Sequence, residues 1–167
     1  MNKSHRILEL LEHAIQQTYR RDNILITQDN PTERPSVHRI AHYLENIMIG
    51  GDFDHLNVDV DYNRNMGNSK FLESVNGNII VDILVHIRNS NSENTLAVEV
   101  KMYDENNTQH QRKLEEIDRD KIKLSGLTND NDRYKFPLGV LVRMNPDGAR
   151  YTYFQHGYEF QSKEEIQ

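Results

Sequence analysis

Residues 79–102 read IIVDILVHIRNSNSENTLAVEVKM and decide the fold of the chain. The first run, residues 79–87, is apolar and rich in β-branched side chains, which is typical of a buried strand. Residues 89–94 are a cluster of turn-forming side chains. Residues 96–102 form a second apolar run. The pattern therefore predicts a β-hairpin with a long loop.

Three charged side chains interrupt the apolar strands of this hairpin. Asp82 lies in the first strand, and Glu99 and Lys101 lie in the second. Because side chains alternate across a strand, Glu99 and Lys101 share one face, whereas Val98 and Val100 share the other. Burying a charged group costs several kcal/mol unless it is paired or binds a metal. Two carboxylates supply the hard oxygen ligands that Mg²⁺ prefers, and a lysine beside them can contact an attacking water or a phosphate.

The charged side chains resemble the Asp…Glu-x-Lys motif of the PD-(D/E)XK nuclease superfamily. Asp82 matches the aspartate, and Glu99-Val100-Lys101 matches the second part of the motif. The proline that usually precedes the aspartate is Val81 here, at a position that is structural and is not a ligand. A buried ion pair with a purely structural role is the alternative interpretation of the same residues.

The likeness extends beyond the motif and covers about residues 33–142. Within it, VDVDYNR at residues 58–64 and VDILVH at residues 81–86 resemble small bacterial members of the superfamily. The resemblance implies an α/β fold of the restriction-endonuclease-like type, in which α-helices flank a mixed central β-sheet. We expect one domain over residues 1–167, with a nuclease-like core over residues 31–155 and an additional N-terminal helix.

A helix is expected over residues 31–49, because proline is tolerated in a first turn and Gly50-Gly51 ends the pattern. Its apolar side chains form one stripe: Val37, Ile40, Ala41, Leu44, Ile47 and Met48. Glu33 projects near the middle of this stripe, whereas Glu45 projects about 100° from its centre. In the family that the chain resembles, a glutamate on this helix completes the metal site, and both the phrase and the geometry select Glu33. The alternative is a glutamate that the helix dipole favours.

A basic helix is expected over residues 109–126, after the hairpin. Its cations are Arg112, Lys113, Arg119, Lys121 and Lys123. Residues 120–128, DKIKLSGLT, resemble the segment that follows Glu-x-Lys in the same family, where helix lysines approach the backbone phosphates. The resemblance thus assigns Lys121 and Lys123 to substrate binding. Arg64 is a further candidate, since it can hold a phosphate or pair with a nearby aspartate. The alternative is an ordinary solvated helix.

Five other segments complete the expected domain. The patterns predict a helix at residues 4–20 capped by Ser4, a short strand or loop at residues 24–27, a half-buried strand at residues 56–62, and strands at residues 137–142 and 149–154. Alternation in the half-buried strand puts Leu56, Val58, Val60 and Tyr62 on one face. The tail from Gln161 is charged and is expected to be frayed.

Composition and charge favour a cytoplasmic domain of ordinary size. The 167 residues include no cysteine, which excludes a disulfide framework and a thiolate zinc site. No apolar run approaches the roughly 18 residues of a membrane span, and the N-terminus leads into an amphipathic helix and not a signal peptide. The net charge of −6 is unfavourable for a nucleic-acid binder. Binding would therefore need a local basic patch, or metal ions that offset the carboxylates.

The resemblance implies a metal-dependent nuclease that hydrolyses phosphodiester bonds, with DNA favoured over RNA. Asp82, Glu99 and Glu33 are the expected Mg²⁺ ligands, and Mn²⁺ can substitute. Lys101 is expected to orient the attacking water and to steady charge on the phosphate. Small nucleases of this kind often act as homodimers, because two strands need two sites. The alternative is a catalytically inactive module of the same fold that binds nucleic acid or a protein partner, and a regulatory metal binder is a third candidate.

Overall fold

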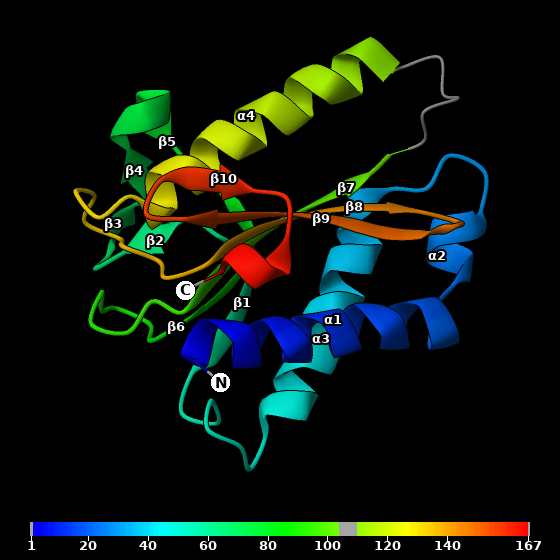
Figure 1. The fold of residues 1–167 in the computed structure, drawn as a ribbon, viewed down its shortest axis with the longest axis horizontal. Coiled ribbons are helices and arrows are strands. Elements are labelled where there is room, and N and C mark those ends of the chain that lie inside the picture. The colour runs from blue at the N-terminus through cyan, green and yellow to red at the C-terminus, as the bar shows by residue number, and fades with distance from the viewer. Residues whose placement is uncertain (1, 104–109, 167) are drawn as a thin grey trace.

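The computed structural model describes residues 2–103 and 110–166, which form four α-helices and a six-stranded mixed sheet (Figure 1). The helices are α1 (Lys3–Arg21), α2 (Ile24–Thr27), α3 (Glu33–Met48) and α4 (His110–Thr128). The strands of the main sheet are β1 (Asn57–Tyr62), β6 (Val81–His86), β7 (Leu96–Met102), β8 (Gly139–Asn145), β9 (Gly148–Gln155) and β10 (Tyr158–Phe160). The smaller elements are β2 (Arg64–Asn65), β3 (Asn68–Ser69), β4 (Phe71–Leu72), η1 (Glu73–Val75), β5 (Gly77–Asn78) and η2 (Lys163–Glu165).

The main sheet has the strand order β1-β6-β7-β8-β9-β10. Only β7 and β8 are parallel among these neighbours, and the other pairs are antiparallel. Parallel strands need a crossover connection, and α4 provides it between β7 and β8. The α/β class and the β6–β7 hairpin that were expected from the sequence are therefore confirmed, and β8 and β9 overlap the two strands expected at residues 137–142 and 149–154. The expected start of the basic helix at Gln109 lies outside the described residues.

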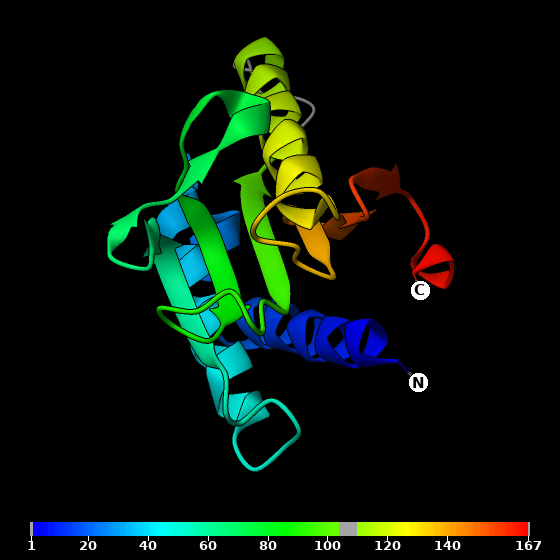
Figure 2. The ribbon, with the colours of Figure 1, turned by 90° about the vertical axis from the view of Figure 1, so that its left-hand side faces the viewer.

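The sheet separates two hydrophobic cores (Figure 2). Helices α1 and α3 pack on one face, where Leu11, Ile40 and Val98 belong to the same core. Helix α4 packs on the other face, where Leu84 and Leu124 belong to the second core. Every residue of β7 is buried, because helices cover both of its faces. A polar side chain on this strand is therefore taken out of water, whichever way it points.

Two details of the helical layer differ from the sequence prediction. The side chain of Asn2, and not that of Ser4, caps α1 by accepting the backbone N–H of His5 at 2.8 Å. Residues 24–27 form the short helix α2, and not a strand or loop. The β-branched side chains of this segment favoured a strand locally. The segment instead connects two helices that pack on the same face, and only Ile26 of its four residues is buried.

The alternation of β1 breaks at Asp61, which has a positive φ of 51° and no partner residue in the register with β6. Val58 and Val60 pack on the α1–α3 core, whereas Tyr62 packs on the α4 core. The prediction that Tyr62 shares a face with the two valines was wrong. The register with β6 is the same before and after Asp61, so the left-handed backbone of this residue redirects the strand without an inserted residue, which a regular pattern of apolar side chains does not reveal.

The C-terminal segment is ordered by packing and capping. Residues 158–160 form β10, and Ser162 caps η2 in a capping box with Glu165. Ile166 is buried in the α1–α3 core. The prediction of a frayed tail from Gln161 was therefore wrong, because one apolar side chain among charged residues suffices to hold the segment on the core. Along the part of the chain that the structure describes, no helix has both the length and the apolar character that a bilayer crossing requires.

A buried lysine lies under the loops that precede β6. Lys70 is 1% exposed, and its ammonium lies 4.4 Å from the centre of the Tyr134 ring and 5.8 Å from that of Tyr62. Burial lowers the pKa of Lys70 to about 8, although Asp132 acts in the opposite direction. Aromatic faces attract a cation by about 1–2 kcal/mol, which is less than the cost of its dehydration.

We expect Lys70→Met to raise the free energy of unfolding by about 2 kcal/mol at pH 7. The folded-state pKa lies below the ordinary value of 10.5, so the unfolded state binds more protons between the two values. The stability of the wild type therefore rises with pH from about 8 to 10.5, and the advantage of the variant shrinks over that window. Urea unfolding of both proteins at pH 7 and pH 10 measures the difference. An equal gain in stability at both pH values would contradict the lowered pKa of Lys70.

Candidate active site

The candidate site begins where β6 and β7 separate. Their pairing includes Ile83 with Val98 and ends there. Continuing the same register would bring Asp82 directly opposite Glu99, on the same face of the sheet. Like charges in such positions repel, and the two strands open at this point. The carboxylate of Asp82 instead accepts the backbone N–H of Val100 at 2.8 Å, so that a side chain replaces a main-chain acceptor.

The two charged side chains of β7 point toward α4. Val98 and Val100 belong to the α1–α3 core, and so Glu99 and Lys101 lie on the opposite face, as the alternation predicted. Glu99 is 2% exposed and Lys101 is 9% exposed. Both groups are therefore out of bulk water and depend on partners for their charge.

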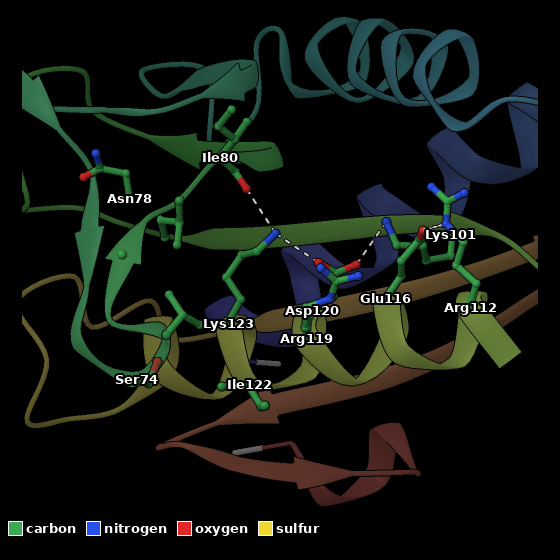
Figure 3. Close-up of a pocket in the computed structure, with 13 residues that line it drawn as sticks. Ser74, Asn78, Ile80, Lys101, Arg112, Glu116, Arg119, Asp120, Ile122 and Lys123 are labelled. Carbon is green, nitrogen blue, oxygen red and sulfur yellow. Dashed lines mark hydrogen bonds and ion pairs between the residues drawn. The ribbon is translucent and has the colours of Figure 1, made fainter.

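Lys123 of α4 provides the first of these partners. Its ammonium donates to the backbone carbonyl of Ile80 at 3.1 Å and lies 3.0 Å from Asp120 (Figure 3). It also donates to the Glu99 carboxylate at 2.7 Å. An ammonium has three N–H groups, and three acceptors surround this one. Lys123 is thus fully engaged with the protein and has no donor left for a phosphate in this arrangement.

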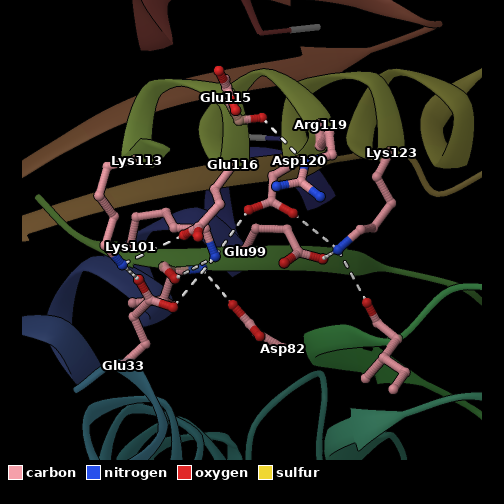
Figure 4. Close-up of polar contacts among 12 residues, drawn as sticks. Glu33, Asp82, Glu99, Lys101, Lys113, Glu115, Glu116, Arg119, Asp120 and Lys123 are labelled. Carbon is pink, nitrogen blue, oxygen red and sulfur yellow. Dashed lines mark hydrogen bonds and ion pairs between the residues drawn. The ribbon is translucent and has the colours of Figure 1, made fainter. Parts of the chain in front are cut away.

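Lys101 lies at the centre of a second set of contacts (Figure 4). Its ammonium is 3.0 Å from the Asp120 carboxylate and 3.4 Å from the Glu33 carboxylate. Glu33 reaches this point from the first turn of α3, and it also pairs with Lys113 of α4 at 2.6 Å. The carboxylates of Asp82 and Glu99 lie between Lys101 and Lys123 in the same view. Residues from β6, β7, α3 and α4 therefore form one cluster of alternating charge.

Burial and mutual repulsion set the protonation of the carboxylates. Burial raises the pKa of Glu99 well above its usual range, and the neighbouring charge of Asp82 raises it further, against the opposing effect of Lys123. Burial also raises the pKa of Asp82, although the Val100 N–H and two lysines oppose it. Both shifts indicate carboxylates that the present cations neutralise incompletely.

The two lysines of the cluster keep their positive charge. Burial alone would lower the pKa of Lys101, but the carboxylates of Asp120 and Glu33 outweigh it, and the pKa is raised. The pKa of Lys123 is raised in the same way by Glu99 and Asp120. Both ammonium groups are consequently charged at neutral pH, and in this state neither can accept a proton from water.

The structure brings together five of the residues that the sequence singled out and separates two others. Glu33, Asp82, Glu99, Lys101 and Lys123 lie in the cluster. Lys121 instead pairs with Glu159 of β10 at 2.9 Å, on another side of α4. Arg64 is exposed in the small β2–β3 ribbon, and the aspartate nearest to it in sequence, Asp61, pairs with Arg34 at 2.7 Å.

Asp120 links the two lysines and was not among the residues predicted from the sequence. Its side chain is 10% exposed, and its two oxygens each lie 3.0 Å from an ammonium, those of Lys101 and Lys123. A signal was present, because Asp120 lies at helical spacing with the apolar Ile117, Leu124 and Leu127. A carboxylate within the buried stripe of the helix that follows Glu99-x-Lys101 faces the strand carrying that motif.

The donor set of the cluster fits a hard divalent cation. In the described part of the chain, no three carboxylate or imidazole side chains converge on one point, since lysines lie between them. Mg²⁺ does not require such a cage, because it is commonly held by one or two carboxylates, waters and substrate phosphates. Asp82 and Glu99 supply two carboxylates with incompletely neutralised charge. Lys123 occupies one oxygen of Glu99, so a cation bound to both carboxylates would compete with this lysine.

Fold and site together define a mixed α/β protein with a buried carboxylate–lysine cluster at the point where two central strands separate. Comparison of the chain with models of known protein families, with curated proteins and with solved structures found no match. The function is therefore inferred from the residues of the cluster and from the resemblance of three of them, Asp82, Glu99 and Lys101, to the Asp…Glu-x-Lys motif.

Proposed function

We propose that the protein is a Mg²⁺-dependent nuclease that hydrolyses phosphodiester bonds, DNA in preference to RNA. The observation that carries the proposal is the convergence of Asp82, Glu99 and Lys101 where β6 and β7 separate. These are the residues that resemble the Asp…Glu-x-Lys motif. A structural ion pair alone would need one partner for each charge, whereas this cluster combines two adjacent carboxylates with raised pKa values.

A restriction-endonuclease-like core is part of the proposal. The antiparallel β6–β7 hairpin, the crossover helix α4 and the parallel strand β8 support it. In this order of elements the motif falls on the two central strands, and α4 covers the face to which the charged side chains of β7 point. The N-terminal helix α1 is then an addition on the opposite face of the sheet.

The chain's own residues divide the work in the proposed reaction. Asp82 and Glu99 would hold Mg²⁺ or Mn²⁺, with Glu33 acting directly or through a water. The bound ion supplies charge neutralisation at the phosphate and lowers the pKa of a bound water. Lys101, charged and held between Asp120 and Glu33, would orient the attacking water through a hydrogen bond from its Nζ. Lys123 would leave Glu99 and become available to the substrate phosphate.

Plasmid, linear and single-stranded DNA incubated with Mg²⁺, Mn²⁺ or EDTA test the proposal. We expect cleavage with either metal and none with EDTA. Lys101→Ala is expected to reduce the rate by at least about 100-fold, because it removes the positioned donor. Lys163→Ala removes an equal charge from a surface pair with Glu12 and is the matched control, with an unchanged rate. Metal-dependent cutting that survives Lys101→Ala would refute the assignment.

A binding module without cleavage is the second candidate, and the saturation of Lys123 by protein acceptors favours it. A cluster whose charges are already paired can serve as a structural core of an inactive fold. Retardation of DNA in gels without any cutting would support this candidate. Calorimetric binding of Mg²⁺ without either DNA effect would support a regulatory metal binder. Sedimentation of the protein alone and with DNA tests whether it acts as a homodimer.

A further inference from the structure

A groove of about 810 Å³ runs along α4 and passes over the cluster (Figure 3). Helix α4 forms one wall, and η1, β5 and residues 79–80 form the other. Lys101, Asp120 and Lys123 belong to its lining, so that whatever lies in the groove meets the charged groups that cover Glu99.

One face of α4 presents a row of cations to the groove. Arg112, Arg119 and Lys123 follow at intervals of seven and four residues, which places them on the same side of the helix. The row extends about 16 Å at a rise of about 1.5 Å per residue. Arg112 is paired with Glu116 at 3.1 Å, but its side chain is 75% exposed, and such a pair exchanges readily for a stronger anion. Lys123 is engaged with protein acceptors, so Arg112 and Arg119 are the members of the row that can contact separate negative charges on an extended ligand.

Apolar side chains edge the same groove. Ile80 is 53% exposed and Val75 is 37% exposed on the wall opposite the helix, and Ile122 is 50% exposed on α4. Each exposes apolar surface, and contact with a flat apolar ligand group would remove that surface from water and stabilise the complex. Cations on the helix and aliphatic groups around them form an amphipathic channel, which fits a ligand with a charged backbone and apolar side groups.

The walls of this groove are held in place by a close contact. Gly126 of α4 packs against Ser74 of η1, so closely that a Cβ on the glycine would clash with the serine side chain. Leu72 packs in the same place and belongs to the buried core under α4. The two walls are thus fixed relative to each other without a ligand, so binding would carry only a small entropy cost for ordering them.

We infer that the groove binds a single strand of nucleic acid, with its phosphates on Arg112 and Arg119 and its bases against Val75, Ile80 and Ile122. This inference rests on the proposed function, since it leads the strand to Lys101. A duplex hides its base faces in stacking, so the aliphatic side chains would find no partner. A duplex also needs a broad basic surface, whereas here the cations form one row on a protein of net charge −6.

Fluorescence anisotropy in EDTA tests the inference, because binding is then measured without cleavage. The probes are a labelled single strand of about 12 nucleotides and the duplex of the same sequence. We expect the single strand to bind at least about 10-fold more tightly than the duplex. Arg112→Gln/Arg119→Gln is expected to weaken single-strand binding at least about 10-fold and to flatten the slope of log K against log salt by about 1.4.

The control variant Arg20→Gln/Arg21→Gln removes the same charge from the end of α1, on the opposite face of the sheet. It is expected to leave affinity within about twofold of the wild type, and its salt slope unchanged. Ile122→Ser, at an exposed site, is expected to weaken single-strand binding about threefold without changing the salt slope. This variant separates the apolar contacts from the electrostatic ones.

Three outcomes would overturn the inference. They are a duplex that binds as tightly as the single strand, an unchanged affinity in Arg112→Gln/Arg119→Gln, and a polyglutamate peptide that binds as tightly as the oligonucleotide. Failure of the proposed function gives a different result. If the protein binds the single strand through the groove but never cuts it, the inference about the groove holds and the nuclease proposal fails. If the protein cuts DNA at the same rate in the groove variants, the nuclease proposal holds and the inference about the groove fails.

Discussion

Lys123→Met is expected to lower the free energy of unfolding by about 3 kcal/mol in EDTA, because it removes the cation from a buried group of carboxylates. Glu99 is 2% exposed, and the ammonium of Lys123 lies 2.7 Å from it. Without that ammonium, Glu99 loses its cation, whereas Asp120 still has Lys101 beside it. Glu99 can take up a proton, since burial already raises its pKa, and this limits the loss.

Divalent metal is expected to reverse part of this loss. When the ammonium is absent, Glu99 is open to a cation, so saturating Mg²⁺ or Mn²⁺ should raise the melting temperature of Lys123→Met by about 3 °C more than that of the wild type. Lys121→Met is the matched control, because its partner Glu159 is a partly exposed surface group. The control should lose at most about 1 kcal/mol and gain nothing from metal. An equal rise in melting temperature in both variants would show that the metal does not bind at Glu99.

In the proposed metal site, lysines and metal would compete for the same carboxylates. A protein that holds carboxylates together before its metal arrives must neutralise them in the meantime, or its folded state loses stability. Lys123 does this for Glu99, and Lys101 does it for Asp120 and Glu33. In the proposed reaction the same lysines then face the substrate, which carries negative charge of its own. The charges that stabilise the fold and those that would bind the substrate belong to the same side chains.

The sequence was sufficient for the parts of the fold that local patterns determine. The two apolar runs around Asp82 and Glu99 are strands β6 and β7, because β-branched side chains and a turn cluster favour a hairpin without help from the rest of the chain. Alternation then placed Glu99 and Lys101 on one face. Helical geometry directed Glu33 toward the apolar side of its helix, and the resemblance singled it out for the site. The structure puts its carboxylate 3.4 Å from the ammonium of Lys101.

Other features depend on contacts that no local pattern contains. The contact between Asp120 and Lys101 depends on how α4 lies across β7, which is a tertiary relation. The broken alternation at Asp61 arises from backbone conformation, and the short helix at residues 24–27 from the space between α1 and α3. The resemblance to nucleases suggested a phosphate contact for Lys123, whereas its three donors face protein acceptors in the structure.

Asp82→Asn is expected to reduce Mg²⁺-dependent DNA cleavage by at least about 1,000-fold, which is about 4 kcal/mol of transition-state stabilisation. The fold should tolerate the change. Burial raises the pKa of Asp82, so its charge is not what stabilises the strand, and the amide oxygen can still accept the Val100 N–H. The variant therefore separates a metal-binding role from a structural one, which the loss of a buried lysine cannot do.

Asp61→Asn is the matched control for this variant. Asp61 is also an aspartate at the end of a sheet strand, its pair with Arg34 is exposed, and its positive φ suits asparagine. We expect its cleavage rate to lie within about twofold of the wild type. Cleavage rates, calorimetric titration with Mg²⁺ and urea unfolding should be measured on both variants. Because the proposed role of Asp82 lies in holding the ion, its variant should lose metal affinity together with activity and keep its stability within about 1 kcal/mol. Full cleavage by Asp82→Asn would leave the two carboxylates with a structural role only, and the nuclease proposal would fail.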